Sequence, residues 1–386
     1  MTSFSDRVLE RLHKLDAAGL RRRSRRVEGP QGPRVSLDGR RVLCLCSNDY
    51  LGLAGHPALL DAVKRAIDAD GLGSGGPRHI SGNMSLHGAA EEAIAAFVRQ
   101  PSGVLFATGY ACNVGTVQAL VEAGDVVFSD RLNHASLIDG ARLSRARVVV
   151  YDHADPDDLR AKLRAHRAEG RGALVITESL FSMDGDIAPL GEVAALAGEF
   201  DAGLLVDEAH ALGVLGPDGR GLAADQGVVP DVTIGTLGKA FGSQGAFAMG
   251  AEPVVDLVRN RARSYVFSTA PWPALGAAAL AALPLVREAD APRALLRQHW
   301  RRLRDGLGAL GYHVIPGDSA IIPVVVGDAD AAMALSRKLY ERGVFVHGIR
   351  PPTVPAGTSR LRVVPMASHT SADIEEALVA FAEVST

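Results

Sequence analysis

Seven short apolar runs, separated by stretches with helical periodicity, constrain the fold of this chain more than any other feature. The runs are GVLFAT (103–108), DVVFSD (125–130), RVVVYD (147–152), ALVITE (173–178), GLLVDE (203–208), VTIGTLG (232–238) and GAFAMG (245–250). Short apolar runs are typical of strands buried on both faces, and the intervening helices supply the crossovers that parallel strands need. We therefore predict an α/β fold with a mainly parallel seven-stranded sheet, covered by helices on both faces.

Different patterns flank this central region. Residues 8–23, VLERLHKLDAAGLRRR, predict an amphipathic helix, and residues 33–47 predict two strands joined at an Asp38-Gly39 turn. After residue 270, two long helical stretches precede a helix near 329–342, a final helix and the short strands YHVIP, IIPVVVG, VFVHGI and RLRVVP. We expect an N-terminal helix and hairpin arm over 1–50, a large domain over 51–270 and a smaller C-terminal α+β domain over 271–386.

The charge and the cysteine content indicate which classes of partner and which cellular compartment to expect. The net charge of -3, from 41 basic and 44 acidic residues, gives no electrostatic case for nucleic acid or an anionic membrane, so small-molecule partners are expected. The basic run Arg21–Arg26 is more typical of a solvated helix end, from which an arginine could reach a phosphate-bearing substrate, than of a nucleic-acid arm. Cys44 and Cys46 share one strand face, where free thiols are common, so we expect no metal site and a reducing cytoplasm.

Two segments match the patterns of a membrane span and of a dinucleotide-binding loop, but other features argue against both interpretations. Residues 264–286 carry no formal charge and are long enough to span a membrane, but Pro271, Pro273 and Pro284 favour a buried connection into an Ala-rich helix. Residues 71–76, GLGSGG, satisfy the dinucleotide-binding pattern G-x-G-x-x-G. That pattern requires a preceding strand and a following helix, whereas this run follows a helical segment, so a flexible loop near a ligand is the better interpretation.

The stretch LLVDEAHALG (204–213) resembles the acidic motif of helicase-type NTPases. Such an enzyme also needs the phosphate loop G-x-x-x-x-G-K-[ST]. The single Gly-Lys pair, Gly238-Lys239, is followed by Ala240, and Thr233 occupies the position of the first glycine. An ATP-dependent nucleic-acid protein is therefore disfavoured.

A pyridoxal phosphate (PLP) site needs a Schiff-base lysine, an acid for the pyridine nitrogen, a flat group over the ring and donors for the phosphate. Lys239 lies on a glycine-flanked turn after a strand, Asp207 ends its own strand, and His134 follows FSD. Residues 109–113, GYACN, begin a helix after a strand. Since ligands bind open α/β sheets at the carboxyl ends of strands, these parts fall where one site could gather them.

Longer motifs carry a family resemblance. SNDYLGL (47–53), GSGGPRHISGN (73–83), DRLNHASLIDG (130–140), ESLFSMDGD (178–186), VDEAHALGVLGPDGRG (206–221) and TLGKAFG (236–242) resemble the α-oxoamine synthases. The resemblance runs from about residue 20 to 370. It implies a fold-type I PLP-dependent transferase, an acyltransferase that condenses an amino acid with an acyl thioester and releases carbon dioxide, and a homodimer with its active site at the subunit interface.

The resemblance also implies a role for each matching residue. Lys239, Asp207 and His134 would attach the cofactor, pair with its pyridine nitrogen and stack over its ring, and Ser182 and His210 would lie near the ring oxygen. Gly109, Tyr110 and Thr236 would bind the phosphate, with Thr269 reaching the neighbouring subunit's site. Arg350 and Asn48 would hold the amino-acid carboxylate, and Arg21 and Thr353 would face the acyl substrate.

One segment indicates the branch of the family. IRPPTVPAGTSRLR (349–362) resembles the branch that condenses L-alanine with pimeloyl-CoA or a pimeloyl carrier protein in biotin biosynthesis. Branches of the glycine C-acetyltransferase, 5-aminolevulinate synthase and serine palmitoyltransferase types remain alternatives. Pro77-Arg78 and Asn83-Met84 depart from the family pattern near the glycine-rich loop, so acyl-chain specificity is the property most open to change.

Overall fold

The computed structural model describes residues 2–385, which divide into two compact units. Unit 1 comprises residues up to 47, residues 183–185 and residues from 295 onward, and unit 2 comprises 48–182 and 186–294. The division therefore falls at residue 294, inside a helix, whereas the sequence predicted a boundary at 270. The expected N-terminal arm belongs to the same unit as the C-terminal residues.

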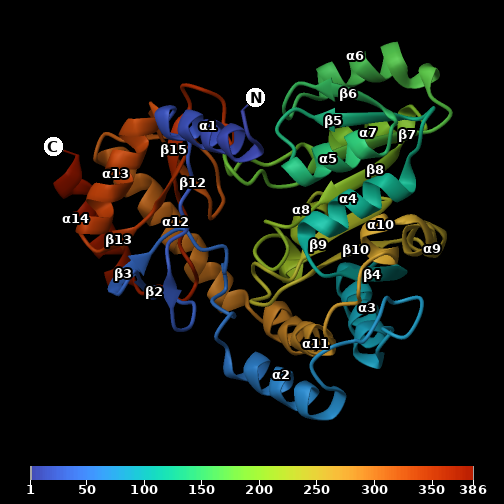
Figure 1. The fold of residues 1–386 in the computed structure, drawn as a ribbon, viewed down its shortest axis with the longest axis horizontal. Helices are drawn as coiled ribbons and strands as arrows, with labels where there is room; N and C mark the ends of the chain where they lie inside the picture. Colours follow the sequence, from blue (N-terminus) through green and yellow to red (C-terminus); the bar gives the residue numbers. More distant parts are fainter. Residues whose placement is uncertain (1, 386) are drawn as a thin grey trace. The chain divides into compact units, whose positions relative to one another are not determined.

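Unit 2 contains the predicted seven-stranded sheet (Figure 1). Its strands are β4 (Ser102–Phe106), β5 (Val126–Asp130), β6 (Arg147–Tyr151), β7 (Ala173–Glu178), β8 (Gly203–Asp207), β9 (Val232–Thr236) and β10 (Ala246–Gly250), in the order β4-β10-β9-β8-β7-β5-β6. The pairs from β9 to β6 are parallel, and β10 is antiparallel to β9 and to β4. All seven predicted strands are confirmed.

Helices cover both faces of this sheet. The helices of unit 2 are α2 (Pro57–Asp70), α3 (Ser85–Val98), α4 (Gly109–Leu120), α5 (Ala135–Leu143), α6 (Pro156–His166), α7 (Leu190–Glu199), α8 (Gly221–Asp225), α9 (Glu252–Arg261), α10 (Arg263–Val266) and α11 (Pro273–Arg287). On one face, Val127, Ile176 and Leu205 share a core with residues of α4, α5 and α9. The alternate residues of these strands, such as Val175 and Val206, point to the other face of the sheet and are also buried. Two-sided burial explains why the strands lack polar alternation.

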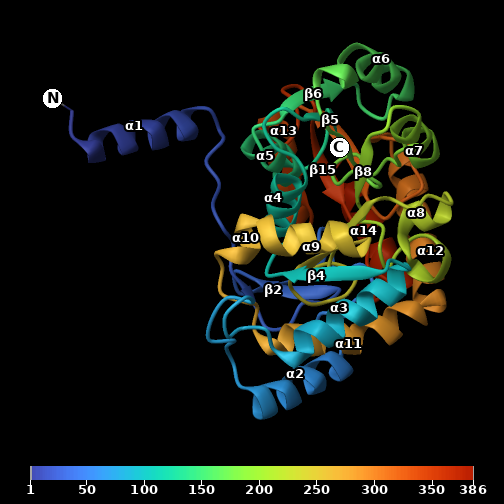
Figure 2. The same ribbon diagram turned by 90° about the vertical axis from the view of Figure 1, so that its right-hand side faces the viewer.

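The suspected membrane stretch forms α10, a connection and α11. Here α11 contacts α2 and α3 (Figure 2), and Ala66, Ala274 and Ala277 form a small core between them. Within residues 2–385, no helix combines the length and apolar character that a membrane span requires. Small alanine side chains allow close helix packing, so the apolar composition reflects a buried helix.

Unit 1 contains two four-stranded sheets. β1 (Val27–Glu28), β2 (Arg34–Leu37), β3 (Arg40–Cys44) and β13 (Val344–Phe345) form the first, and β11 (His313–Val314), β12 (Ile322–Gly327), β15 (Ser359–Val363) and β14 (His347–Ile349) form the second. The helices are α1 (Phe4–Ala17), α12 (Asp290–Ala309), which spans the division, α13 (Ala329–Glu341) and α14 (Ser371–Val384).

Two sequence expectations change here. The segment VFVHGI is not one strand, because β13 pairs with β3 while β14 pairs with β15. The N-terminal helix begins earlier than predicted and ends at Ala17, before the arginine run, and none of its residues is buried. The Asp38-Gly39 turn is confirmed, with φ of 52° and 79°, as a two-residue hairpin of this kind requires.

Candidate active site

The carboxyl ends of four neighbouring parallel strands carry polar residues of unit 2. Asp130, Glu178, Asp207 and Thr236 are the last residues of β5, β7, β8 and β9. Because these strands are parallel and adjacent, their ends lie along one edge of the sheet, where open α/β folds bind ligands. The order of the strands thus gathers residues that are more than 100 positions apart in the chain.

Asp207 is buried and accepts hydrogen bonds from neutral donors. Its Oδ2 accepts from Asn113 Nδ2 at 2.8 Å, and its Oδ1 accepts from the backbone N–H of Ala209 at 2.9 Å. Hydrogen bonds to the charged form of a carboxylate favour that form. A carboxylate can accept more than two hydrogen bonds, so Asp207 retains capacity for a further N–H donor.

Asn113 connects Asp207 to His134. The same Nδ2 donates to Ser136 Oγ at 2.8 Å, and Ser136 Oγ lies 2.7 Å from His134 Nδ1. Ser136 N also donates to that Nδ1 at 3.3 Å, so Nδ1 is an acceptor and the proton of the neutral ring resides on Nε2. Ser136 lies within a motif that carries the family resemblance and Asn113 ends the segment GYACN, but nothing in the sequence showed that they would meet.

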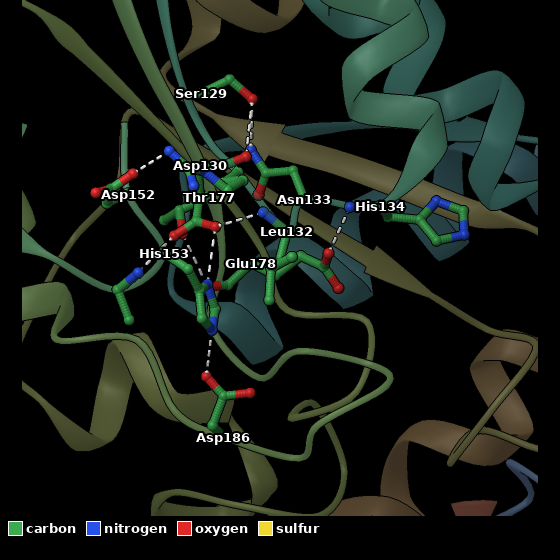
Figure 3. A network of polar contacts seen from close by, with 12 residues as sticks. Ser129, Asp130, Leu132, Asn133, His134, Asp152, His153, Thr177, Glu178 and Asp186 are labelled. Atoms are coloured by element: carbon green, nitrogen blue, oxygen red, sulfur yellow. Dashed lines mark hydrogen bonds and ion pairs between the residues drawn. The ribbon is translucent and has the colours of Figure 1, made fainter. Parts of the chain in front are cut away.

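The His134 ring is suited to a neutral stacking role. Partial burial lowers the pKa of the imidazole; Asp207 opposes this shift, and nearby Lys239 adds to it. The backbone N–H of His134 donates to Glu178 Oε1 at 2.6 Å, and in Figure 3 the ring points away from that carboxylate. Burial and the charge of Asp207 raise the pKa of Glu178.

Glu208 differs from its neighbour Asp207 in role. It accepts from Ser179 Oγ at 2.6 Å and from the backbone N–H groups of Leu222 and Ala223 at 3.0 and 2.6 Å. These bonds tie the start of α8 to the end of β8, and burial raises the pKa of Glu208 to about 6. The second letter of DEAH is therefore a structural acid.

The lysine turn packs closely on the SNDYLGL segment. Gly242 has φ of 65°, and a Cβ there would lie 2.4 Å from the backbone carbon of Leu53. Asp49 accepts from the N–H groups of Leu53 and Ala54 at 2.9 and 3.1 Å, which fixes the opposing chain. The turn that carries Lys239 can approach the sheet edge only with glycine at position 242.

Tyr50, from the same segment, contacts His210. Its hydroxyl lies 2.7 Å from His210 Nδ1, and the two rings meet edge to face with centroids 6.1 Å apart. Both residues are buried. Sequence reasoning selected His210 and missed Tyr50, although SNDYLGL was among the quoted motifs.

The first turn of α4 presents backbone donors. Thr108 caps the helix by accepting from Ala111 N at 3.1 Å, and a Cβ at Gly109 would meet nothing within 4 Å. The side chain of Tyr110 donates to Asp139 at 2.6 Å, which raises the pKa of the phenol, so only its backbone N–H is placed for an anion. Thr236 Oγ1 donates to the carbonyl of Gly245 at 3.0 Å and accepts from Gly238 N at 3.1 Å.

The predicted substrate residues Arg21, Arg350 and Thr353 come together within unit 1. Arg350 Nη2 donates to the carbonyl of Arg21 at 3.0 Å, and Arg22 donates to Thr353 Oγ1 at 2.9 Å. Asn48 begins unit 2. Ser182 is partly buried in the loop after β7, and Thr269 is exposed before α11.

Arg78, one of the departures from the family pattern, is a structural residue. It forms a bidentate ion pair with Glu91 at 2.9 and 3.0 Å, and its Nε donates to Asn83 at 2.8 Å. Glu91 also accepts from the backbone N–H of Leu105 at 2.8 Å. The guanidinium therefore faces the interior of unit 2 and braces the glycine-rich loop against α3 and β4.

These residues fit PLP. Asp207 offers a buried carboxylate with spare acceptor capacity, the Lys239 turn lies beside the strand ends, and α4 presents first-turn N–H groups next to a glycine with open space. Asn113 Oδ1 is buried without a hydrogen-bond partner, so the polar network is incomplete within the protein. Such orphaned groups are costly and are common where a ligand completes the site.

Comparisons with known proteins identify the family. The family model for aminotransferase class I and II matches residues 40–381. The chain is 50% identical to the 8-amino-7-oxononanoate synthase of Geotalea daltonii, over 97% of this chain and 96% of that protein. It is also 50% identical to the enzyme of that name from Geobacter metallireducens, over 99% and 98%.

Three solved structures share the fold. A serine palmitoyltransferase from Sphingomonas wittichii is 34% identical with a TM-score of 0.92, covering 98% of this chain and 96% of that one. A further serine palmitoyltransferase, solved with PLP, is 32% identical with a TM-score of 0.92 and the same coverage. An 8-amino-7-oxononanoate synthase from Francisella tularensis is 28% identical with a TM-score of 0.76, covering 89% and 97%.

Half of the residues are identical to those of these sequence relatives over almost the whole length, whereas identity to the serine palmitoyltransferases is about one third. The chain belongs to the class I and II aminotransferase family and, within it, to the 8-amino-7-oxononanoate synthases.

Proposed function

We propose that this chain condenses L-alanine with a pimeloyl thioester, on CoA or a carrier protein, to give 8-amino-7-oxononanoate, carbon dioxide and a free thiol. The observation that carries the proposal is the 50% identity to 8-amino-7-oxononanoate synthases over almost the full chain. The reaction belongs to biotin biosynthesis. The three free cysteines support a reducing, cytoplasmic location.

PLP, when bound, supplies the electron sink that stabilises negative charge at the α-carbon of the amino acid during condensation and decarboxylation. Asp207 holds the pyridine nitrogen in its protonated form, which requires the ionised carboxylate that Asn113 and Ala209 N support. His134 stacks over the ring. Lys239 Nζ would attach the cofactor and would move a proton from and to the α-carbon of the amino acid.

The remaining site residues bind and orient. The first-turn N–H groups of Gly109 and Tyr110 would hold the phosphate, as the positive end of a helix favours. Thr236 would join them by turning its O–H from the Gly245 carbonyl to the phosphate. His210, oriented by Tyr50, and Ser182 contact the ring oxygen. Arg350 and Asn48 hold the alanine carboxylate, and Arg21 and Thr353 contact the acyl donor.

We propose a homodimer in which Thr269 contacts the neighbouring subunit's cofactor. Large apolar side chains are exposed near it, with Leu72 at 69%, Ile80 at 82% and Phe267 at 71% exposure. Ala270 N donates to the carbonyl of Gly76 at 3.0 Å, so these two exposed segments are joined. Apolar residues grouped in this way are typical of a protein interface, and light scattering should give twice the chain mass of 40.4 kDa.

A matrix of substrates tests the reaction. Purified protein with PLP is assayed with pimeloyl, acetyl, succinyl and palmitoyl thioesters, each with alanine, glycine or serine. We expect pimeloyl thioester with alanine to be preferred, and Lys239→Ala to abolish turnover and the visible absorption of the lysine-bound cofactor. Preference for any other combination overturns the branch assignment, and absence of that absorption in the wild type overturns the enzyme class.

One observation favours a second function. The backbone resembles serine palmitoyltransferase more closely than the Francisella tularensis enzyme, with TM-scores of 0.92 and 0.76. Serine with a palmitoyl thioester is therefore the main alternative, and the matrix contains that pair.

A further inference from the structure

His153, which no part of the proposed chemistry uses, lies between two carboxylates. Its Nδ1 is 2.9 Å from Asp130 Oδ1, and its Nε2 is 2.7 Å from Asp186 Oδ2 (Figure 3). Its ring meets Phe181 edge to face with centroids 4.3 Å apart. The imidazole is thus fixed on three sides, immediately after the end of β6.

Only a doubly protonated imidazole satisfies this geometry. Ionised carboxylates accept hydrogen bonds and cannot donate them, and a neutral imidazole donates from one nitrogen only. Burial alone would lower the pKa of His153, but its hydrogen bonds with Asp130 and Asp186 raise that pKa to about 10. The bridge is therefore intact at neutral pH.

Asp130 connects His153 to the loop that carries His134. The Asp130 side chain is buried and also accepts from the backbone N–H groups of Leu132 at 2.8 Å and Ala154 at 2.9 Å. We call residues 131–134 the stacking loop. Its backbone is therefore held by the same carboxylate that pairs with His153.

Asp186 connects His153 to the segment that carries Ser182. We call residues 180–187 the Ser182 hairpin, because Leu180 and Ile187 form an antiparallel bridge and Phe181 N donates to the carbonyl of Asp186 at 3.0 Å. Asp186 thus lies at the base of the hairpin, opposite Phe181. The imidazole contacts both sides of that base.

We propose that His153 is a positioning residue, whose bridge between Asp130 and Asp186 sets the stacking loop and the Ser182 hairpin at the spacing that the cofactor ring requires. The proposal rests on the proposed function, since it assigns His134 and Ser182 to the ring. A binding site loses affinity for its ligand when the interactions that position its ligand-binding residues are loosened, even though those residues are still present.

A double-mutant cycle measures the bridge. In the full chain stripped of PLP, His153→Gln, Asp186→Asn and the pair are titrated with PLP. Gln carries no charge and has both of its N–H donors on one nitrogen, so it cannot replace two ring nitrogens that face carboxylates on opposite sides. We therefore expect each single variant to bind PLP about 10-fold more weakly, as loss of one charged hydrogen bond implies. The pair should bind no more weakly than the worse single variant, because both changes remove one interaction.

His166→Gln is the matched control. That histidine is similarly exposed, at 28% against 23% for the His153 side chain, and lies 3.2 Å from Glu169 on the surface. It should leave PLP affinity within about twofold of the wild type, as expected for an exposed pair.

Backbone amide exchange in the PLP-free chain gives a readout that does not need the cofactor. His153→Gln should speed exchange in the stacking loop and the Ser182 hairpin, and leave β12 unchanged. Unchanged exchange in both segments, or uniformly faster exchange with wild-type PLP affinity, would overturn the proposal. Failure of the wild type to bind PLP would instead count against the proposed function, and the exchange result would still decide whether His153 holds the two segments.

Discussion

Asn113 Nδ2 donates to Asp207 Oδ2 at 2.8 Å and, with its other hydrogen, to Ser136 Oγ at 2.8 Å. Since Ser136 also contacts His134 Nδ1, one amide joins the expected partner of the pyridine nitrogen to the residue expected over the ring. α4 and α5 therefore orient two expected cofactor contacts through a single buried side chain. The residue that does so is neither charged nor nucleophilic.

Replacing Asn113 should weaken cofactor binding. We expect Asn113→Ala to reduce PLP affinity about 10- to 100-fold, because a hydrogen bond to a charged group contributes about 1.5–3 kcal/mol. PLP titration followed by absorbance measures this. Asn260→Ala is the control, since Asn260 also faces an aspartate, Asp256, but on the exposed surface. Equal affinity in both variants would show that Asn113 does not support Asp207.

The adjacent acids Asp207 and Glu208 should differ in their effect on turnover. Asp207→Asn should abolish turnover, whereas Glu208→Gln should retain it. Asp207→Asn should also lower the Tm of the PLP-free chain, because its amide NH2 would face either Asn113 Nδ2 or Ala209 N. Glu208→Gln should lower that Tm too, because an amide NH2 would face the donors Leu222 N and Ala223 N, at about 1–3 kcal/mol for an unsatisfied buried group. Thermal unfolding and turnover of both variants decide this, and the reverse pattern of turnover would contradict the assignment.

The parallel sheet was predictable because both faces are buried, which leaves continuous apolar runs in the sequence. The gathering of Lys239, Asp207 and His134 near the strand ends was predictable, because polar residues that follow buried strands stand out locally. Asn113, Ser136 and Tyr50 were not, because each acts through a partner on a distant segment. VFVHGI, as one apolar run, gave no sign that its halves join different sheets.

Arg78 shows what a local pattern leaves open. As a departure from the family pattern in the glycine-rich loop it raised the question of acyl-chain specificity, and the structure places its guanidinium against buried Glu91. A local pattern identifies an unusual residue but not the direction of its side chain. The fold of the backbone decides whether a charged side chain contacts a ligand or a partner inside the protein.

Gly242 should be intolerant of a side chain. Gly242→Ala adds a Cβ 2.4 Å from Leu53 and keeps a φ of 65°, so strain and overlap both destabilise it, by about 1–3 kcal/mol for the overlap alone. Gly227→Ala measures the cost of the backbone conformation alone, since Gly227 has φ of 68° and no atom lies within 4 Å of the added Cβ. We expect a larger loss of Tm for Gly242→Ala in thermal unfolding. Equal losses would mean that the lysine turn is not closely packed.

Arg78→Met should destabilise the fold without changing the preferred thioester. Breaking a buried ion pair leaves Glu91 uncompensated and costs about 3–5 kcal/mol. The matched control is Arg302→Met, which removes a similar bidentate pair with Glu375 on the surface and should cost about 1 kcal/mol or less. Denaturant unfolding gives the stabilities, and the thioester matrix gives the preference. A change of preferred acyl chain in Arg78→Met would restore the specificity role.

His153 should give the wild type a loss of stability at alkaline pH. Its pKa is raised from 6.5 to about 10, so the folded state binds the proton more tightly than the unfolded state. This contribution is complete below pH 6.5 and declines as the pH rises toward 10. Over pH 7 to 10 the free energy of unfolding of the wild type should therefore fall more steeply than that of His153→Gln, by an additional amount on the order of 2 kcal/mol for a partly exposed ring. Denaturant unfolding at each pH measures both curves. Other charged side chains lie on the segments around His153, namely Asp130, Asp186, Arg131, Asp152, Asp158 and Glu178. Tyr151 is also nearby, and burial raises its pKa. These groups are common to both proteins, so the difference between the two curves isolates His153, and parallel curves would show that the bridge is not charged.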